Sequence, residues 1–100
     1  MITITTEIEE KIPAWDSNPN TPDEEVDIII RFYCPQAGWE WFVTGGEKIK
    51  DDWHFFGYIK KEIKDWGFFW LSDLHDLQSK TGFIIERDPY FTNKKIKDIL

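Results

Sequence analysis

The stretch WGFFWLSDLHDLQSKTGFIIERDPYF, Trp66 to Phe91, decides the fold because it holds much of the apolar bulk and a dense cluster of opposite charges. Its apolar run Gly67 to Leu71 predicts a buried strand. Ser72 is a typical N-cap, and leucines at helical spacing predict a short helix over residues 72–78. The chain then leads into the tripeptide Glu86-Arg87-Asp88. We expect a sheet to form around this stretch.

The segments upstream predict the rest of that sheet. Residues 26–34, VDIIIRFYC, alternate between two faces, and so do residues 39–43, WEWFV, with PQAG between them as a turn. Residues 44–52 are polar, contain Gly45-Gly46 and are expected to form a mobile connection into a third strand over residues 53–60. With residues 67–71 this makes an antiparallel meander of about four strands.

Short helices complete the prediction. The pattern Thr6-x-x-Glu9 is typical of a capping box and predicts an N-terminal helix over residues 6–12. Residues 13–25 hold three prolines and are expected to form a loop with an acidic tip. Thr92 is expected to cap a last helix that reaches Leu100. The fold class is therefore α+β, an antiparallel sheet with short helices, in one domain of residues 1–100.

Composition limits the classes of function. The net charge is -7, from 19 acidic and 12 basic residues, which disfavours direct nucleic-acid binding and favours a basic partner, although acidity also keeps an aromatic-rich domain soluble. The single Cys34, expected in the core, and two histidines indicate no disulfide, metal site or cofactor. No run approaches the roughly 20 apolar residues that span a membrane, and no secretory signal is visible, so we expect a cytoplasmic protein.

Several motifs carry a family likeness. They are Gly38-Trp39-x-Trp41, Phe55-Phe56-Gly57, Gly67-Phe68-Phe69 before Leu71-Ser72-Asp73-Leu74, and Gly82 before Glu86-Arg87-Asp88-x-Tyr90-Phe91. With these motifs the chain resembles domain-of-unknown-function family 2958, small proteins of plasmids, integrative elements and phages. The chain departs from the family pattern at Gly45, where an acidic residue is usual, and at Trp70, Lys80 and Ile84. The resemblance implies a mobile-element origin and assigns no catalytic residue.

The aromatic side chains allow two interpretations. Flat rings could line a pocket for a base or another small ligand, or they could simply pack the core. The rings in question are Trp39, Trp41, Trp53, Phe55, Trp66, Phe68 and Trp70.

The tripeptide Glu86-Arg87-Asp88 also allows two interpretations, an acid-base site or a structural charge network. In a strand Arg87 points away from its two neighbours, so the network is favoured. We expect Arg87 to pair with Asp73 or Glu62 and to hold this segment against the helix at Ser72. No Ser-His-Asp or Cys-His arrangement can be argued, and we expect a non-enzyme.

The sequence thus favours a binding protein of a mobile element or phage that inhibits a host defence system, for example a CRISPR effector or restriction nuclease, by covering a basic protein surface. The alternative is a small-molecule or nucleotide binder with an aromatic pocket. No membrane partner is expected. The candidate binding residues are Trp39, Trp41, Asp23, Glu24, Glu25, Glu86, Arg87, Asp88 and Tyr90.

Overall fold

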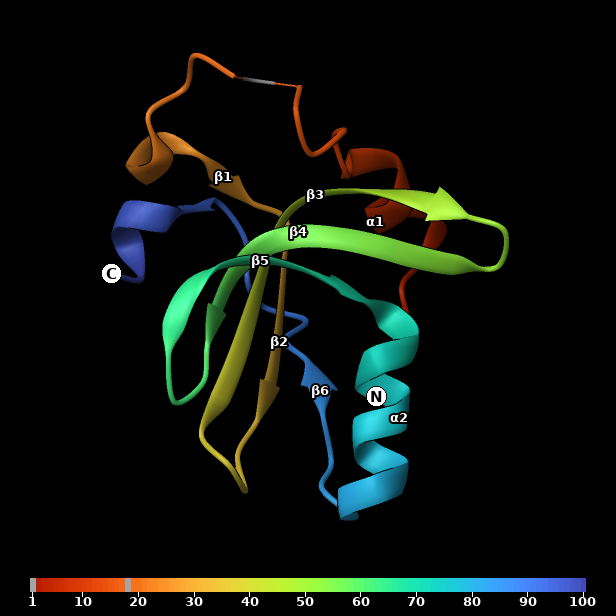
Figure 1. Ribbon diagram of the computed structural model, residues 1–100. Helices are drawn as coiled ribbons and strands as arrows, with labels where there is room; N and C mark the ends of the chain where they lie inside the picture. Colours follow the sequence, from red (N-terminus) through yellow and green to blue (C-terminus); the bar gives the residue numbers. More distant parts are fainter. Residues whose placement is uncertain (1, 18) are drawn as a thin grey trace.

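The computed structural model describes residues 2–17 and 19–100, and it has the predicted α+β fold (Figure 1). Its main sheet is antiparallel with the strand order β5-β4-β3-β2-β6. The strands are β2 (Ile30–Cys34), β3 (Trp39–Ile49), β4 (Asp52–Lys60), β5 (Lys64–Trp70) and β6 (Glu86–Arg87). The meander β2 to β5 is confirmed. The additional strand β6 joins its edge, with Arg87 opposite Phe32 and Glu86 opposite Tyr33.

The β3–β4 hairpin is longer than expected. Residues 44–52, predicted as a mobile connection, extend both strands, and the turn falls at Lys50, which has a φ of 57°. The register shifts between Val43 and Gly45, and pairing then continues through Gly46 opposite Phe55. The two glycines interrupt the side-chain alternation next to this shift, while the strands continue to pair beyond it, so the pattern failed to show a real strand.

The predicted strand over residues 26–34 divides at Ile29. Before this residue, β1 (Asp27–Ile28) pairs with β7 (Lys94–Lys95) in a small second sheet. After it, β2 pairs with β3 and β6, and the Ile29 amide itself donates to the Val43 carbonyl at 2.8 Å. The chain stays extended and changes partners.

The described part of the chain contains two 3-10 turns. Residues Ile96–Asp98 form the turn η2, which replaces the longer C-terminal helix expected after Thr92. Residues Asp23–Glu25 form the turn η1 within the predicted loop 13–25, and η1 packs against η2. Buried Ile96 anchors the C-terminal turn.

Two of the three predicted helices are present as α-helices, with shifted ends. In α1 (Thr6–Lys11) the cap is Thr5, whose hydroxyl accepts from the Ile8 amide at 3.3 Å, so the predicted Thr6–Glu9 capping box is wrong. Helix α2 (Leu71–Thr81) starts before Ser72 because the Asp73 carboxylate accepts from the Trp70 amide at 2.9 Å. It ends at Gly82, whose φ of 73° suits glycine.

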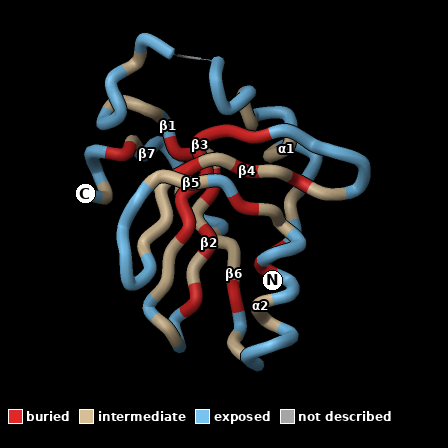
Figure 2. The backbone as a smooth tube through the Cα atoms, in the orientation of Figure 1, coloured by how far each residue is buried: buried red, intermediate tan, exposed pale blue. Residues whose placement is uncertain are grey.

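The core lies between one face of the sheet and the helices (Figure 2). Phe32, Val43, Phe55 and Ile85 are completely buried there, and Leu74 of α2 packs onto them. Cys34 is buried as predicted. A smaller cluster of Ile28, Phe42 and Ile96 lies on the other face, under the C-terminal turn. Among the described residues, no helix is long and apolar enough to cross a membrane.

Candidate functional site: an aromatic surface on the second sheet face

The second face of β4 and β5 is built from rings. Strand alternation sends Phe55 of β4 and Phe69 of β5 into the core. The residues on either side of them in each strand point to the opposite face. The register places these outer residues opposite one another as His54↔Trp70, Phe56↔Phe68 and Tyr58↔Trp66. Their ring centroids lie 4.4, 4.8 and 5.7 Å apart, respectively. Such cross-strand aromatic pairs stabilise a sheet, by about 0.5–1.5 kcal/mol each beyond their buried area.

A seventh ring comes from the segment after α1. The Trp15 ring meets Phe68 edge to face at 5.2 Å and Phe56 at 5.8 Å. Trp15 is 51% exposed and Phe68 is 46% exposed. We call the set of seven rings the aromatic surface, namely Trp15, His54, Phe56, Tyr58, Trp66, Phe68 and Trp70.

The glycine pair of β3 allows Trp15 to reach this face. The Gly46 amide donates to the Pro13 carbonyl at 2.9 Å, which fastens the segment to the strand. A Cβ at Gly45 would lie 2.8 Å from the Cα of Trp15 and 3.0 Å from the Pro13 oxygen. Only glycine leaves room for this backbone approach. The departure from the family pattern at Gly45 therefore has a structural consequence in this chain.

A cavity of about 380 Å³ opens beside Trp15. Trp15, Phe56 and Trp66 provide its aromatic walls, and Asp16 and Asp23 are its charged residues. No Lys or Arg occurs among its described lining residues. This lining suits a flat neutral or cationic group and disfavours a phosphate.

The rim of the aromatic surface is acidic at the Trp15 end and beside His54, whereas the same face ends beyond Tyr58 in the cross-strand pair Lys60↔Lys64. Asp16 and Asp23 lie at the Trp15 end, and exposed Glu47 lies opposite His54 in the register of the hairpin. In a chain of net charge -7 these carboxylates favour cationic groups at this face.

The seven-ring pocket predicted from the sequence does not form, because the sheet separates its members. Trp41 is only 2% exposed, and Trp39 packs at the edge of the same core. Trp53 and Phe55 stack within that core at 5.8 Å. The other three predicted rings, Trp66, Phe68 and Trp70, lie on the opposite face. The alternation in the sequence could have separated the core rings from the outer rings. It gives no sign that Trp15 and His54 lie beside the outer rings.

Trp39, a predicted binding residue, is held by polar neighbours. Its Nε1 donates to the Glu62 carboxylate at 3.3 Å, and the Lys61 ammonium lies 4.9 Å from its ring centroid. The acidic tip is likewise partly engaged. Glu25 accepts from the Lys97 ammonium at 3.1 Å, whereas Asp23 and Glu24 are exposed.

The residues of the Glu86 to Tyr90 segment do not converge. Arg87 donates from Nε to the Thr3 carbonyl at 2.8 Å, so the predicted ion pair with Asp73 or Glu62 is wrong. Both of those carboxylates accept backbone or indole N–H groups instead. Arg87 thus holds the N-terminal segment rather than α2. Glu86 lies in β6, and Tyr90 is 88% exposed.

The charge network of this region is centred on Arg31, which the sequence did not single out. Its guanidinium donates to Glu40 at 2.8 Å and to Asp88 at 3.0 Å, and it lies 4.4 Å from the Tyr33 ring centroid. The network joins β2, β3 and the segment after β6. Since both carboxylates are engaged by one arginine, the arrangement is that of a structural tie.

Two other carboxylates hold the helices to the hairpin. Hydrogen bonds from the Trp53 indole and the Lys48 ammonium lower the pKa of Glu9 on α1. Burial works to raise the pKa of Asp52 on β4, but hydrogen bonds from Ser72 and the Trp53 amide outweigh it, and the pKa is lowered. Within residues 2–17 and 19–100, no group of three His, Cys, Asp or Glu side chains could hold a metal ion.

Residues 3–97 match the family described as protein of unknown function (DUF2958). The chain belongs to this family. In this DUF2958 protein the matched range contains both α-helices, the whole main sheet and the aromatic surface. The match confirms the family resemblance noted in the sequence. No curated protein and no solved structure matches the chain.

Proposed function

We propose that this DUF2958 protein is a non-enzymatic binding protein of a mobile element, which inhibits a host defence nuclease in the host cytoplasm by covering its basic surface. CRISPR effectors and restriction enzymes are the candidate partners. The observation that supports the proposal is the aromatic surface, where Trp15 and Phe68 are about half exposed beside Phe56 and Trp70.

The composition of the aromatic surface is that of an interface. Tryptophan, tyrosine and phenylalanine are enriched in the buried centres of protein interfaces, where rigid rings give large contact areas at low entropic cost. Here the rings already pack on one another in the free protein. Little ordering is therefore needed on binding, which favours affinity.

Charge complementarity identifies the kind of partner. The rim carboxylates Asp16, Asp23 and Glu47 and the net charge of -7 attract a basic surface and speed its encounter with this one. Arginine and lysine side chains can also lie on exposed ring faces through cation–π contacts, which contribute roughly 0.5–1 kcal/mol each at exposed sites. A nucleic-acid channel of a nuclease offers such a basic surface.

The experiment measures nuclease cleavage and co-elution with a panel of CRISPR effectors and restriction enzymes. We expect the protein to co-elute with one of them and to slow its cleavage. Phe68→Ala should weaken that inhibition about tenfold or more, as loss of an interface anchor does. Ile84→Ala removes an exposed apolar side chain elsewhere and is the matched control. Unchanged cleavage across the whole panel without co-elution would contradict the proposal.

The cavity beside Trp15 supports a second candidate, a binder of small aromatic molecules. Its lining of three rings and two aspartates favours a neutral or cationic flat ring over a nucleotide with its phosphates. The test compares adenosine with AMP by tryptophan fluorescence and by melting temperature. Adenosine should bind and AMP should bind more weakly. If adenosine changes neither the emission nor the melting temperature at millimolar concentration, this candidate is excluded.

A further inference from the structure

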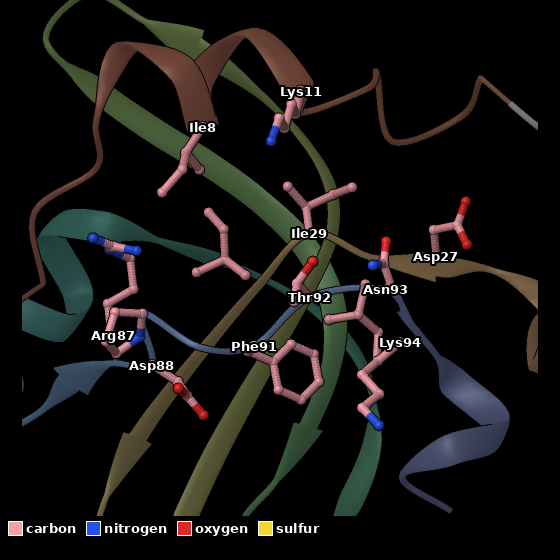
Figure 3. Close-up of a pocket in the computed structure, with 13 residues that line it drawn as sticks. Ile8, Lys11, Asp27, Ile29, Arg87, Asp88, Phe91, Thr92, Asn93 and Lys94 are labelled. Atoms are coloured by element: carbon pink, nitrogen blue, oxygen red, sulfur yellow. The ribbon is translucent and has the colours of Figure 1, made fainter.

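A second cavity, of about 410 Å³, lies away from the aromatic surface, between α1, the β1–β2 edge and the segment that joins β6 to β7. Figure 3 shows its side chains, with Ile8 and Lys11 contributed by α1 and Thr92 and Asn93 by the C-terminal segment. We call this cavity the basic groove. Neither the family match nor the proposed binding surface assigns it a role.

Three cations line the basic groove, and none of them has a described carboxylate within ion-pair distance. They are Lys11, Arg87 and Lys94. Arg87 donates one hydrogen bond to the neutral Thr3 carbonyl, which leaves its charge uncompensated.

The acidic residues of the lining are already engaged. The Asp27 carboxylate accepts from Lys95 at 2.9 Å, and the Asp88 carboxylate accepts from Arg31 at 3.0 Å. The groove is therefore locally positive in a protein whose net charge is -7. Local cations of this kind attract an anion despite the negative net charge, because salt screens the field of exposed charges beyond about 10 Å.

Apolar side chains form the remaining wall. Ile8 of α1 and Ile29 at the β1–β2 break face the cavity beside Phe91 (Figure 3). Asn93 has a φ of 55°, a left-handed conformation that asparagine tolerates, and this turn places Thr92 and Lys94 on either side of it in the lining. Hydroxyl and amide groups thus lie beside an isoleucine wall.

We propose that the basic groove binds a small organic anion. Its phosphate or carboxylate group is held by Lys11 and Arg87, which flank Ile8, and its apolar part lies on Ile8 and Ile29 (Figure 3). Arginine and lysine side chains bind both phosphate and carboxylate groups through charge-assisted hydrogen bonds. A volume of about 410 Å³ falls within the range of small-molecule sites, and an apolar wall with a few polar groups is their usual composition.

The test is titration of the isotope-labelled protein by NMR with inorganic phosphate, isovalerate and AMP. The amide signals of Ile29, Thr92 and Asn93 should shift and saturate, while that of Phe68 on the aromatic surface stays in place. Isovalerate or AMP should bind at least threefold more tightly than inorganic phosphate because of the apolar wall. The comparison of isovalerate with AMP distinguishes a carboxylate ligand from a phosphate ester.

Charge variants give the second arm. Lys11→Gln should weaken binding about fivefold, as expected for one partly exposed charge-assisted contact. Because the Lys94 ammonium points away from Lys11 and Arg87 (Figure 3), Lys94→Gln should weaken binding less. Lys80→Gln, at the exposed end of α2, removes the same charge far from the groove and should leave binding unchanged. The proposal is overturned if no probe gives saturable shifts up to 50-fold excess, or if Lys80→Gln weakens binding as much as Lys11→Gln.

Discussion

At the scale of single residues, Gly57 marks the tightest place in the sheet. A Cβ at this position of β4 would lie 1.8 Å from the Phe42 carbonyl oxygen, which is backbone and cannot turn aside. Gly57→Ala should therefore lower the free energy of unfolding by about 3 kcal/mol or more, at the upper end of overpacking effects. Urea unfolding followed by circular dichroism measures this.

The matched control for Gly57 is its cross-strand neighbour Gly67. A Cβ at Gly67 would meet just the flexible end of Ile59, at 3.4 Å. Gly67→Ala should thus cost less than about 1 kcal/mol. Equal losses in the two variants would show that missing space is not the reason for glycine at position 57.

Arg31 is the residue on which the charge network depends. The side chains of Arg31, Glu40 and Asp88 are each about three-quarters covered. Their ion pairs are therefore intermediate between exposed and buried salt bridges. We expect Arg31→Met to lower the free energy of unfolding by about 2 kcal/mol, because two carboxylates lose their shared partner. A double-mutant cycle with Asp88→Asn should give a coupling of about 1 kcal/mol. Purely additive losses would contradict a direct tie.

At the scale of elements, the segment before η1 and the strand β3 depend on one another through Gly45. Gly45→Ala should displace the Pro13 to Trp15 backbone and move Trp15 off Phe56 and Phe68. Tryptophan emission should then shift to longer wavelength, and acrylamide should quench it more strongly. In a Trp15→Phe background the same substitution should leave emission unchanged. A shift that persists there would assign the effect to another tryptophan.

The elements also show what the sequence could predict. Alternating residues identified β2, which has one fully buried face, and the first half of β3. Strands of two residues, such as β6, have no period to recognise. The second half of β3 was missed because Gly45-Gly46 carry no side chains to alternate. The Arg31–Asp88 pair spans 57 positions, so only the strand register could reveal it.

At the scale of the whole molecule, the two sheet faces have different roles. One face packs against α1 and α2 through a continuous core. The other is covered by the C-terminal turn at Phe42 and carries the aromatic surface farther along β4 and β5. Helix α1 contacts the β3–β4 hairpin through Glu9 and lines the basic groove with Lys11. Ligands at the two proposed sites would therefore contact separate parts of one scaffold.

The acid response of the molecule follows from the carboxylates that fasten the helices. Trp53 and Lys48 favour the charged form of Glu9, and Ser72 favours that of Asp52, so both pKa values lie below the ordinary 4.5 and 3.8. A lowered folded-state pKa means that the unfolded chain binds protons more readily. The stability contributed by each group is thus fully present above its ordinary pKa and is lost as the pH falls through the lower folded-state value.

We therefore expect the melting temperature to fall as the pH is lowered from 6 toward 3. Glu9→Gln and Asp52→Asn should each reduce the melting temperature at pH 6 and make its decline toward acid pH less steep, because one of the responsible carboxylates is gone. Asp76→Asn, on the exposed side of α2, is the control and should leave the slope as it is. If all three variants keep the parent's slope, Glu9 and Asp52 do not couple protonation to the docking of α1 and α2 on the hairpin.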